Sequence, residues 1–176
     1  MRTIVFDTET TGLPLHAHAP LEAQPHIIEF AAIVLEDGEP AGDGTLLIHP
    51  GMNISPEITR ITGLKDEDLK GKPNFRESLP RIRQAFRHCD QVIAHNLRFD
   101  KMMLFFELAR IGCEDFDWPT IETCTVETYQ ELFGFYPKLT YLYQEKIGIP
   151  LIQTHRAMDD VKALVQIVQK EKLWKR

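Results

Sequence analysis

Hydrophobic and polar positions alternate over residues 3–12, and this pattern predicts a β-strand that runs into a turn rich in threonine and glycine. Side chains leave a strand on alternate faces, so Asp7 and Glu9 share a face with Val5, whereas Phe6 points to the other. Both faces carry bulky apolar residues. The strand is therefore expected at the centre of a sheet that is covered on two sides.

The rest of the pattern predicts an α/β fold. Strands over residues 26–35 and 44–49 follow by short links, which favours antiparallel pairing. Strands then alternate with helices, which indicates a mixed sheet flanked by helices and a single domain over residues 1–176. The later strands are predicted at 91–95 and 120–123, a short turn at 66–69, and the helices at 55–63, 78–88, 97–111, 126–132, 139–147 and 157–172.

Composition narrows the class of protein. An apolar content of 43% and a charged content of 26% are ordinary for a globular chain. Three cysteines without a C-x-x-C pair indicate neither a disulfide framework nor a zinc site. The first strand begins at residue 3 and no apolar run could cross a bilayer, so we expect no signal peptide, no membrane partner and a cytoplasmic location.

The net charge of −6 argues at first against a nucleic-acid partner. Two observations weaken this objection. Two bound divalent cations would reduce the net charge to −2, and the basic residues are clustered, since 11 of the 20 lysines and arginines lie between residues 60 and 110. A solvated helix face is the favoured reading for most of these, with a nucleic-acid surface as the alternative.

Carboxylates occupy positions where apolar residues are expected. Asp7 and Glu9 leave the same face of the first strand, and at about 5 Å their repulsion is roughly 3 kcal/mol. Asp100 falls on the apolar stripe of the helix at 97–111, and Asp160 on that of the last helix, whereas Asp159 faces water. Three separate elements therefore direct acids into the interior.

Ionised carboxylates in such settings need a partner, and lysine and arginine are absent from these stripes. A cation from solution is the natural partner, and an all-oxygen ligand set favours Mg²⁺ or Mn²⁺. The alternative is that Asp100 and Asp160 only interact with helix dipoles. That alternative explains each acid alone, but not why both lie on the buried face.

Two further residues stand out. His155 lies in a loop five residues before Asp160, where it could take a proton from water or could have no function. Glu29 lies among apolar residues of the second strand. It could support the acids from behind, but a cross-strand or substrate-side hydrogen bond is the favoured reading.

These residues belong to three motifs that resemble those of the DEDDh 3′-to-5′ exonucleases, the group that includes the proofreading subunit of bacterial replicative DNA polymerase. The motifs are Asp7–Leu13, Ala94–Asp100 and His155–Asp160, the last with H-x-A-x-x-D spacing. A D-x-E alone has almost no specificity, but three motifs in the right order on the right elements make coincidence improbable.

The resemblance implies a ribonuclease H-like fold, with a five-stranded mixed sheet of order 3-2-1-4-5. It also implies that Asp7, Glu9, Asp100 and Asp160 hold two divalent cations, Mg²⁺ or Mn²⁺, with His155 as general base.

Other motif residues are expected to contact substrate. Leu13 matches a position whose apolar side chain packs against the terminal base in family members. Thr10 matches a position whose backbone contacts the terminal 3′-hydroxyl. The second motif places His95, Asn96 and Phe99 at the substrate, although a core position is the favoured reading for Phe99.

The implied reaction is metal-dependent hydrolysis of the terminal phosphodiester of single-stranded or frayed nucleic acid, with DNA favoured, releasing nucleoside 5′-monophosphates in proofreading or repair. The expected partners are DNA or RNA 3′ ends and a DNA polymerase. Alternatives are a non-catalytic nucleic-acid- or polymerase-binding module, an exoribonuclease, and a metal-dependent hydrolase of another substrate or polarity.

Overall fold

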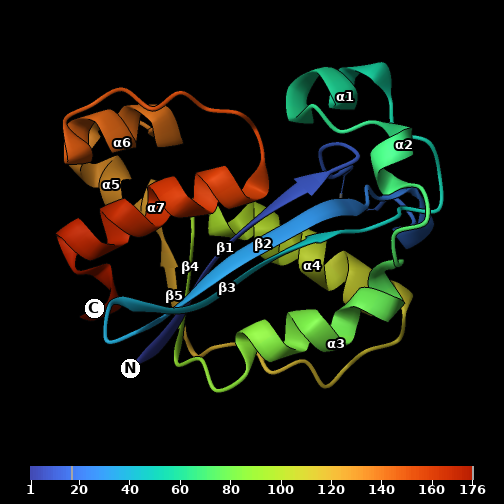
Figure 1. The fold of residues 1–176 in the computed structure, drawn as a ribbon, viewed down its shortest axis with the longest axis horizontal. Helices are drawn as coiled ribbons and strands as arrows, with labels where there is room; N and C mark the ends of the chain where they lie inside the picture. The colour runs from blue at the N-terminus through green and yellow to red at the C-terminus, as the bar shows by residue number, and fades with distance from the viewer. Residues whose placement is uncertain (17, 176) are drawn as a thin grey trace.

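The computed structural model describes residues 1–16 and 18–175, which contain one five-stranded sheet of order β3-β2-β1-β4-β5 (Figure 1). The central strand β1 (Arg2–Thr10) pairs antiparallel with β2 (Ile27–Glu36) and parallel with β4 (Gln91–Ala94). Antiparallel β3 (Glu39–Leu47) and parallel β5 (Ile121–Cys124) complete the sheet. The predicted mixed sheet and its strand order are confirmed.

Helices cover both faces of the sheet (Figure 1). Helices α3 and α4 lie on one face and α5, α6 and α7 on the other, while α1 and α2 lie beyond the ends of β2 and β3. The bounds are α1 Pro56–Thr62, α2 Asp66–Leu69, α3 Phe75–Phe86, α4 Leu97–Arg110, α5 Thr125–Phe133, α6 Leu139–Ile147 and α7 Ala157–Glu171, with short 3₁₀ turns η1 Leu21–Ala23 and η2 Leu173–Lys175. None of the helices in the described ranges is long and apolar enough to cross a membrane.

Strand β1 separates two hydrophobic cores. Ile4 and Phe6 are buried in the core beneath α3 and α4, whereas Val5 is buried in the core beneath α5–α7. This alternation confirms the prediction of a central strand covered on both faces, and it directs Asp7 and Glu9 toward α7. That residues 1–176 form a single domain stays a prediction.

Two predicted boundaries were wrong. The third strand begins at Glu39 instead of residue 44, because β3 is an edge strand whose first seven residues are exposed and therefore carry no apolar alternation. Helix α3 begins at Phe75 instead of residue 78, after a capping box formed by Asn74 and Glu77. Pro80 consequently lies inside the helix and not in its first turn.

Candidate active site

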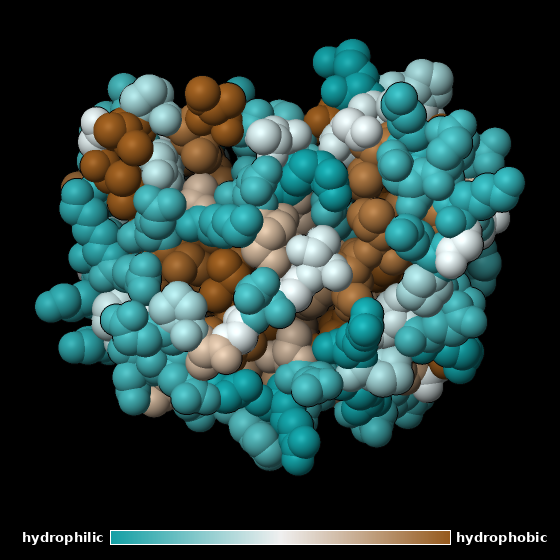
Figure 2. Space-filling model, viewed as in Figure 1, coloured by the Kyte–Doolittle hydropathy of each residue, from teal (hydrophilic) through white to brown (hydrophobic). Residues whose placement is uncertain are grey.

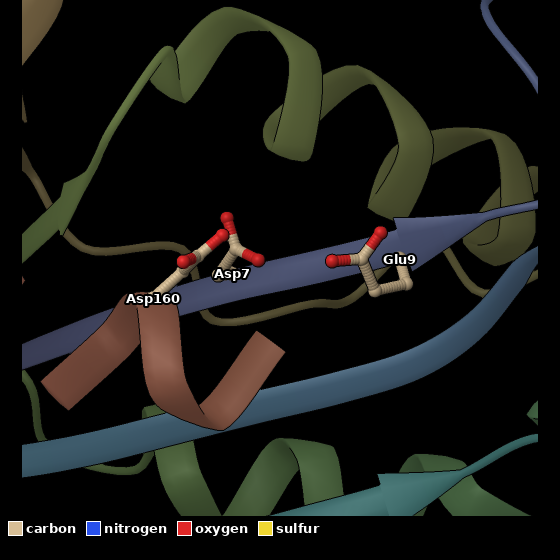
Figure 3. Close-up of side chains that lie close together, drawn as sticks. All are labelled: Asp7, Glu9 and Asp160. Carbon is tan, nitrogen blue, oxygen red and sulfur yellow. The ribbon is translucent and has the colours of Figure 1, made fainter. Parts of the chain in front are cut away.

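Three carboxylates from two elements converge beside the C-terminal half of β1. Asp7 and Glu9 are half-buried on the strand, and Asp160 is buried in the first turn of α7. Each offers one oxygen that lies within 4.8 Å of the other two (Figure 3). The sequence prediction brought these three residues together, and the structure places them in one cluster.

Helix packing explains the position of Asp160. Val161, Leu164 and Val168 of α7 pack in the same core as Val5, so the acid at the start of this stripe lies over the face that carries Asp7. The neighbouring Asp159 is exposed, as predicted, and accepts a hydrogen bond from the Thr154 hydroxyl at 2.7 Å.

Asp100 is bound to Thr8, the residue between Asp7 and Glu9. Its Oδ1 accepts hydrogen bonds from the backbone N–H of Thr8 at 3.0 Å and from the Thr8 hydroxyl at 2.7 Å. Only 2% of the residue is exposed. It therefore contacts the residue between Asp7 and Glu9 and is not one of the three clustered carboxylates.

Burial and mutual repulsion disfavour ionisation of all four acids. Burial first, and then the charges of Asp100, Glu9 and Asp160, raise the pKa of Asp7 well above its usual value. Burial and neighbouring acids raise the pKa of Glu9 to about 8, and burial raises that of Asp100 to about 7. Burial also raises the pKa of Asp160.

This donor set fits a hard divalent cation. Within the part of the chain that the structure describes, no lysine or arginine forms an ion pair with Asp7, Glu9 or Asp160. All three offer carboxylate oxygens, which Mg²⁺ and Mn²⁺ prefer. Positive charge at the cluster would remove the repulsion that raises these pKa values.

The loop before α7 carries His155 next to the cluster. The residue is exposed and has a left-handed backbone with φ +52°. Its charge lowers the pKa of Asp160, which places the ring near that acid, although it is not a member of the three-residue cluster. Gln153 of the same loop donates to Oδ2 of Asp160 at 2.7 Å, a contact that the sequence did not indicate.

Three of the predicted substrate contacts line one groove, whose lining residues do not include the clustered acids. Leu13, which is 78% exposed, lies there with Asn96 and the half-buried Phe99 in a space of about 820 Å³. Phe99 also packs against the core beneath α4, in line with the favoured reading of its position. Thr10 is buried, and its hydroxyl donates to the carbonyl of Gly12 at 2.8 Å.

His95 occupies a different environment. Its Nδ1 lies 2.9 Å from the Thr125 hydroxyl, and the ring also hydrogen-bonds the backbone of Pro137. Burial lowers the pKa of His95 to about 4, so the ring is neutral at physiological pH. It is not among the residues that line the groove. Its predicted role at the substrate stays a prediction.

The family model RNase_T, described as "Exonuclease", matches residues 4–168. Among curated proteins, the chain is 31% identical over 170 residues to a PolC-type DNA polymerase III of Clostridium perfringens, covering 94% of this chain. It is 29% identical over 164 residues to the PolC-type DNA polymerase III of Thermotoga petrophila, covering 93%. The chain spans only 11% of the length of each of these relatives.

Solved structures show the same fold. The nuclease domain of 3′hExo, a DEDDh family member bound to rAMP, superposes with a TM-score of 0.75 at 16% identity, covering 99% of this chain and 92% of that one. Exonuclease X in complex with 5′ overhanging duplex DNA gives a TM-score of 0.67 at 21% identity, covering 97% and 93%. These likenesses confirm the predicted ribonuclease H-like fold.

The family match over residues 4–168 defines the class as an exonuclease, and the motifs and the fold resemble those of the DEDDh 3′-to-5′ exonucleases. The chain belongs to the RNase_T exonuclease family, and it resembles the proofreading exonuclease of bacterial DNA polymerase III.

Proposed function

We propose that this chain hydrolyses the terminal phosphodiester at the 3′ end of single-stranded or frayed nucleic acid and releases nucleoside 5′-monophosphates. DNA is the proposed substrate because the curated relatives are named DNA polymerases. The observation that carries the proposal is the cluster of Asp7, Glu9 and Asp160, whose oxygens converge and which form no ion pair with a lysine or arginine among the described residues.

Asp7, Glu9, Asp100 and Asp160 would hold two divalent cations, Mg²⁺ or Mn²⁺, with Asp100 held by Thr8 next to Asp7 and Glu9. Such ions, when bound, lower the pKa of a water nucleophile and neutralise charge on the leaving oxygen. Asp7 belongs to a rigid central strand, and the hydrogen bonds from Thr8 fix Asp100. The ligands are therefore held in place by the fold, which reduces the reorganisation needed during reaction.

His155 is the proposed general base. Its exposed ring lies near Asp160, and an imidazole in this position can act as general base toward the attacking water. Gln153 and Thr154 of the same loop hydrogen-bond Asp160 and Asp159, which keeps the loop that carries His155 next to the cluster.

The groove lined by Leu13, Asn96 and Phe99 is the proposed site of the terminal nucleotide. An exposed leucine and a half-buried phenylalanine offer apolar surface to a base of any identity. The backbone at Thr10, at the end of β1, is the proposed contact of the terminal 3′-hydroxyl. Pairing of the last nucleotide would oppose its entry, which explains the proposed preference for frayed ends.

A role in proofreading or repair beside a DNA polymerase is also proposed. It is supported by the PolC-type relatives, in which the matching segment is part of a polymerase chain.

Digestion of end-labelled oligonucleotides tests the reaction. DNA and RNA strands labelled at the 3′ or the 5′ end are incubated with Mg²⁺ or with EDTA, beside an Asp7→Asn variant as control. We expect immediate release of a labelled mononucleotide from 3′-labelled DNA, only with Mg²⁺ and only with the unmodified chain. Release of the 5′ label first would contradict the polarity, and preference for RNA would assign an exoribonuclease. No digestion of any strand would support a non-catalytic binding module.

A further inference from the structure

Glu29 is a buried acid in the middle of an apolar strand. Its side chain is 1% exposed, and it faces Glu9 in the antiparallel register of β1 and β2. Its carboxylate accepts hydrogen bonds from Arg156 Nε at 3.0 Å and Arg156 Nη2 at 2.7 Å. The backbone N–H of Ala157 also donates to it, at 3.2 Å. One side chain of β2 thus binds the segment that begins α7.

The bound segment carries two of the proposed functional residues. His155 directly precedes Arg156, and Asp160 lies one helical turn after it, with its N–H donating to the Arg156 carbonyl at 3.2 Å. The Glu29 carboxylate therefore fixes His155 and Asp160 relative to β2, the strand that pairs with β1. Movement of Arg156 would move His155 and Asp160 together.

Glu29 also replaces a missing helix cap. The N-cap residue of α7 is Arg156, whose side chain makes no capping hydrogen bond to its own helix. The N–H groups of a first turn need acceptors, and Ala157 donates to Glu29 from a distant strand. The position at which α7 starts is consequently tied to the sheet beside Glu9.

We propose that the Glu29–Arg156 ion pair is a positioning device, which holds Asp160 and His155 at working distance from Asp7 and Glu9. The inference rests on the proposed function of the cluster. It assigns no direct contact with substrate to either member. The purely structural alternative is that the pair only attaches α7 to the sheet, as the ion pair of Lys146 and Glu171 does at 3.1 Å near the C-terminal end of the same helix.

Variants that separate charge from geometry test this inference. Arg156→Lys keeps the positive charge but cannot make both hydrogen bonds at once, and Glu29→Gln keeps the shape and one acceptor oxygen. Arg156→Met alone would leave a buried unpaired acid and could fail to fold. The double variant Glu29→Gln/Arg156→Met removes both charges and so restores stability without restoring the hydrogen bonds.

Three quantities are measured for each variant: melting temperature in EDTA, Mn²⁺ affinity from the metal-dependent rise in melting temperature, and kcat and KM on a 3′-labelled DNA strand. We expect the double variant to melt near the unmodified chain, yet to lose roughly 10- to 100-fold in Mn²⁺ affinity or kcat. Arg156→Lys should retain intermediate values, with KM nearly unchanged.

Lys146→Met is the matched control at the other end of α7. It should lower the melting temperature while leaving Mn²⁺ affinity and kcat unchanged. A double variant that regains full Mn²⁺ affinity and kcat along with its stability would overturn the positioning role. Because Mn²⁺ affinity is read without turnover, this result stays distinct from a failure of the exonuclease proposal, which would show as an inactive unmodified chain.

Discussion

The carboxylates of the cluster repel one another, and the neighbouring acids all disfavour the ionised form of Asp7. Asp100, Glu9, Asp160 and Glu29 each raise its pKa, in addition to burial. Residues that bind a ligand through charge destabilise a protein when the ligand is absent. The same acids therefore favour metal binding and weaken the metal-free fold.

Replacement of Asp7 by Asn separates these two effects. We expect Asp7→Asn to abolish exonuclease activity and to stabilise the metal-free protein by about 1 to 3 kcal/mol, because one partner of the repulsion is removed. Thermal unfolding in EDTA and digestion of 3′-labelled DNA measure the two outcomes. Asp43→Asn, at an exposed position of β3, is the control and should change neither. A less stable metal-free Asp7→Asn protein would count against a repulsive cluster.

His155 should behave differently from the ligands. Since the ring is outside the group of clustered oxygens, His155→Ala should lower kcat roughly 10²- to 10⁴-fold with little change in Mn²⁺ affinity. Single-turnover digestion and a metal titration by thermal shift give the two values. An unaltered rate would remove His155 from the mechanism, and a large loss of affinity would make it a ligand instead.

Sequence alone could predict part of this site. Helical periodicity distinguished Asp160 from Asp159, because each residue of α7 turns by a fixed angle and only one of the pair can join the apolar stripe. The contact of Glu29 with Arg156 could not be predicted, since 127 residues separate them and the pairing depends on how α7 packs on β2. Glu29 was visible only as an acid in an apolar strand.

At the scale of secondary structure elements, helix α4 holds the connection between β1 and β2. Arg110 Nη2 donates to the carbonyls of Leu21 at 3.0 Å, Gln24 at 2.5 Å and Pro25 at 3.1 Å. Glu107 of the same helix accepts from the backbone N–H of Ile27 at 3.0 Å. Leu13, Leu21 and Gln24 of this connection line the groove, so α4 determines one of its walls.

Loss of the Arg110 side chain should loosen that wall. We expect Arg110→Met to raise KM for a 3′-labelled strand several-fold more than it lowers kcat, because the cluster on β1 and α7 is untouched. It should also cost roughly 1 to 3 kcal/mol of stability, since three carbonyls lose a hydrogen-bond donor and Glu107 loses one of its partners. Steady-state kinetics and thermal unfolding measure these changes. Arg60→Met, at an exposed site on α1, is the control, and an unchanged KM would separate the groove from substrate binding.

The bounds of some helices and strands could be predicted from the sequence more accurately than those of others. The helix at 139–147 was predicted to the residue, because buried leucines, a preceding lysine and a following glycine define its ends. The segment at 66–69 was predicted as a short turn and forms the short helix α2 with the same bounds. The first half of β3 was missed, since Glu39 and Asp43 pair with β2 through backbone hydrogen bonds that no side-chain pattern reports. The start of α3 was missed because Pro80 was taken as a first-turn residue, although the Asn74–Glu77 capping box was present in the sequence.

At the scale of the whole molecule, the net charge of −6 is distributed unevenly. Several acids form ion pairs, as Glu107 does with His26 and Arg110. Among the described residues, the clustered acids form none with a lysine or arginine. Burial opposes ionisation of Glu107, but hydrogen bonds from His26 and Ile27 and the charge of Arg110 hold its pKa below the usual value. The two kinds of acid therefore give the protein opposite dependences of stability on pH.

The sign of each contribution follows from linkage. The pKa of Glu9 is about 8 in the folded protein and 4.5 as a free side chain, so the unfolded chain loses its proton first as pH rises. The contribution of Glu9 to the free energy of unfolding is complete below pH 4.5 and is lost progressively as pH rises to about 8. Glu107, whose folded pKa is lowered, contributes stability above pH 4.5 and loses it only at lower pH. Between about pH 5 and 8, the raised pKa values of Asp7, Glu9 and Asp100 therefore outweigh the opposite contribution of His95, whose pKa is lowered to about 4 and which adds stability as pH rises to 6.5.

We expect the melting temperature of the metal-free protein to fall as pH rises from about 5 to 8, and saturating Mg²⁺ to remove most of that fall. Protons and Mg²⁺ would compete for the same oxygens, so the shift caused by Mg²⁺ should be small at pH 5 and large at pH 8. Thermal unfolding at matched ionic strength in EDTA and in Mg²⁺ measures both curves. Asp7→Asn should flatten the metal-free curve and abolish most of the response to Mg²⁺. A melting temperature that is level across this range without metal, or equal responses to Mg²⁺ at both ends, would show that the clustered acids do not share a cation.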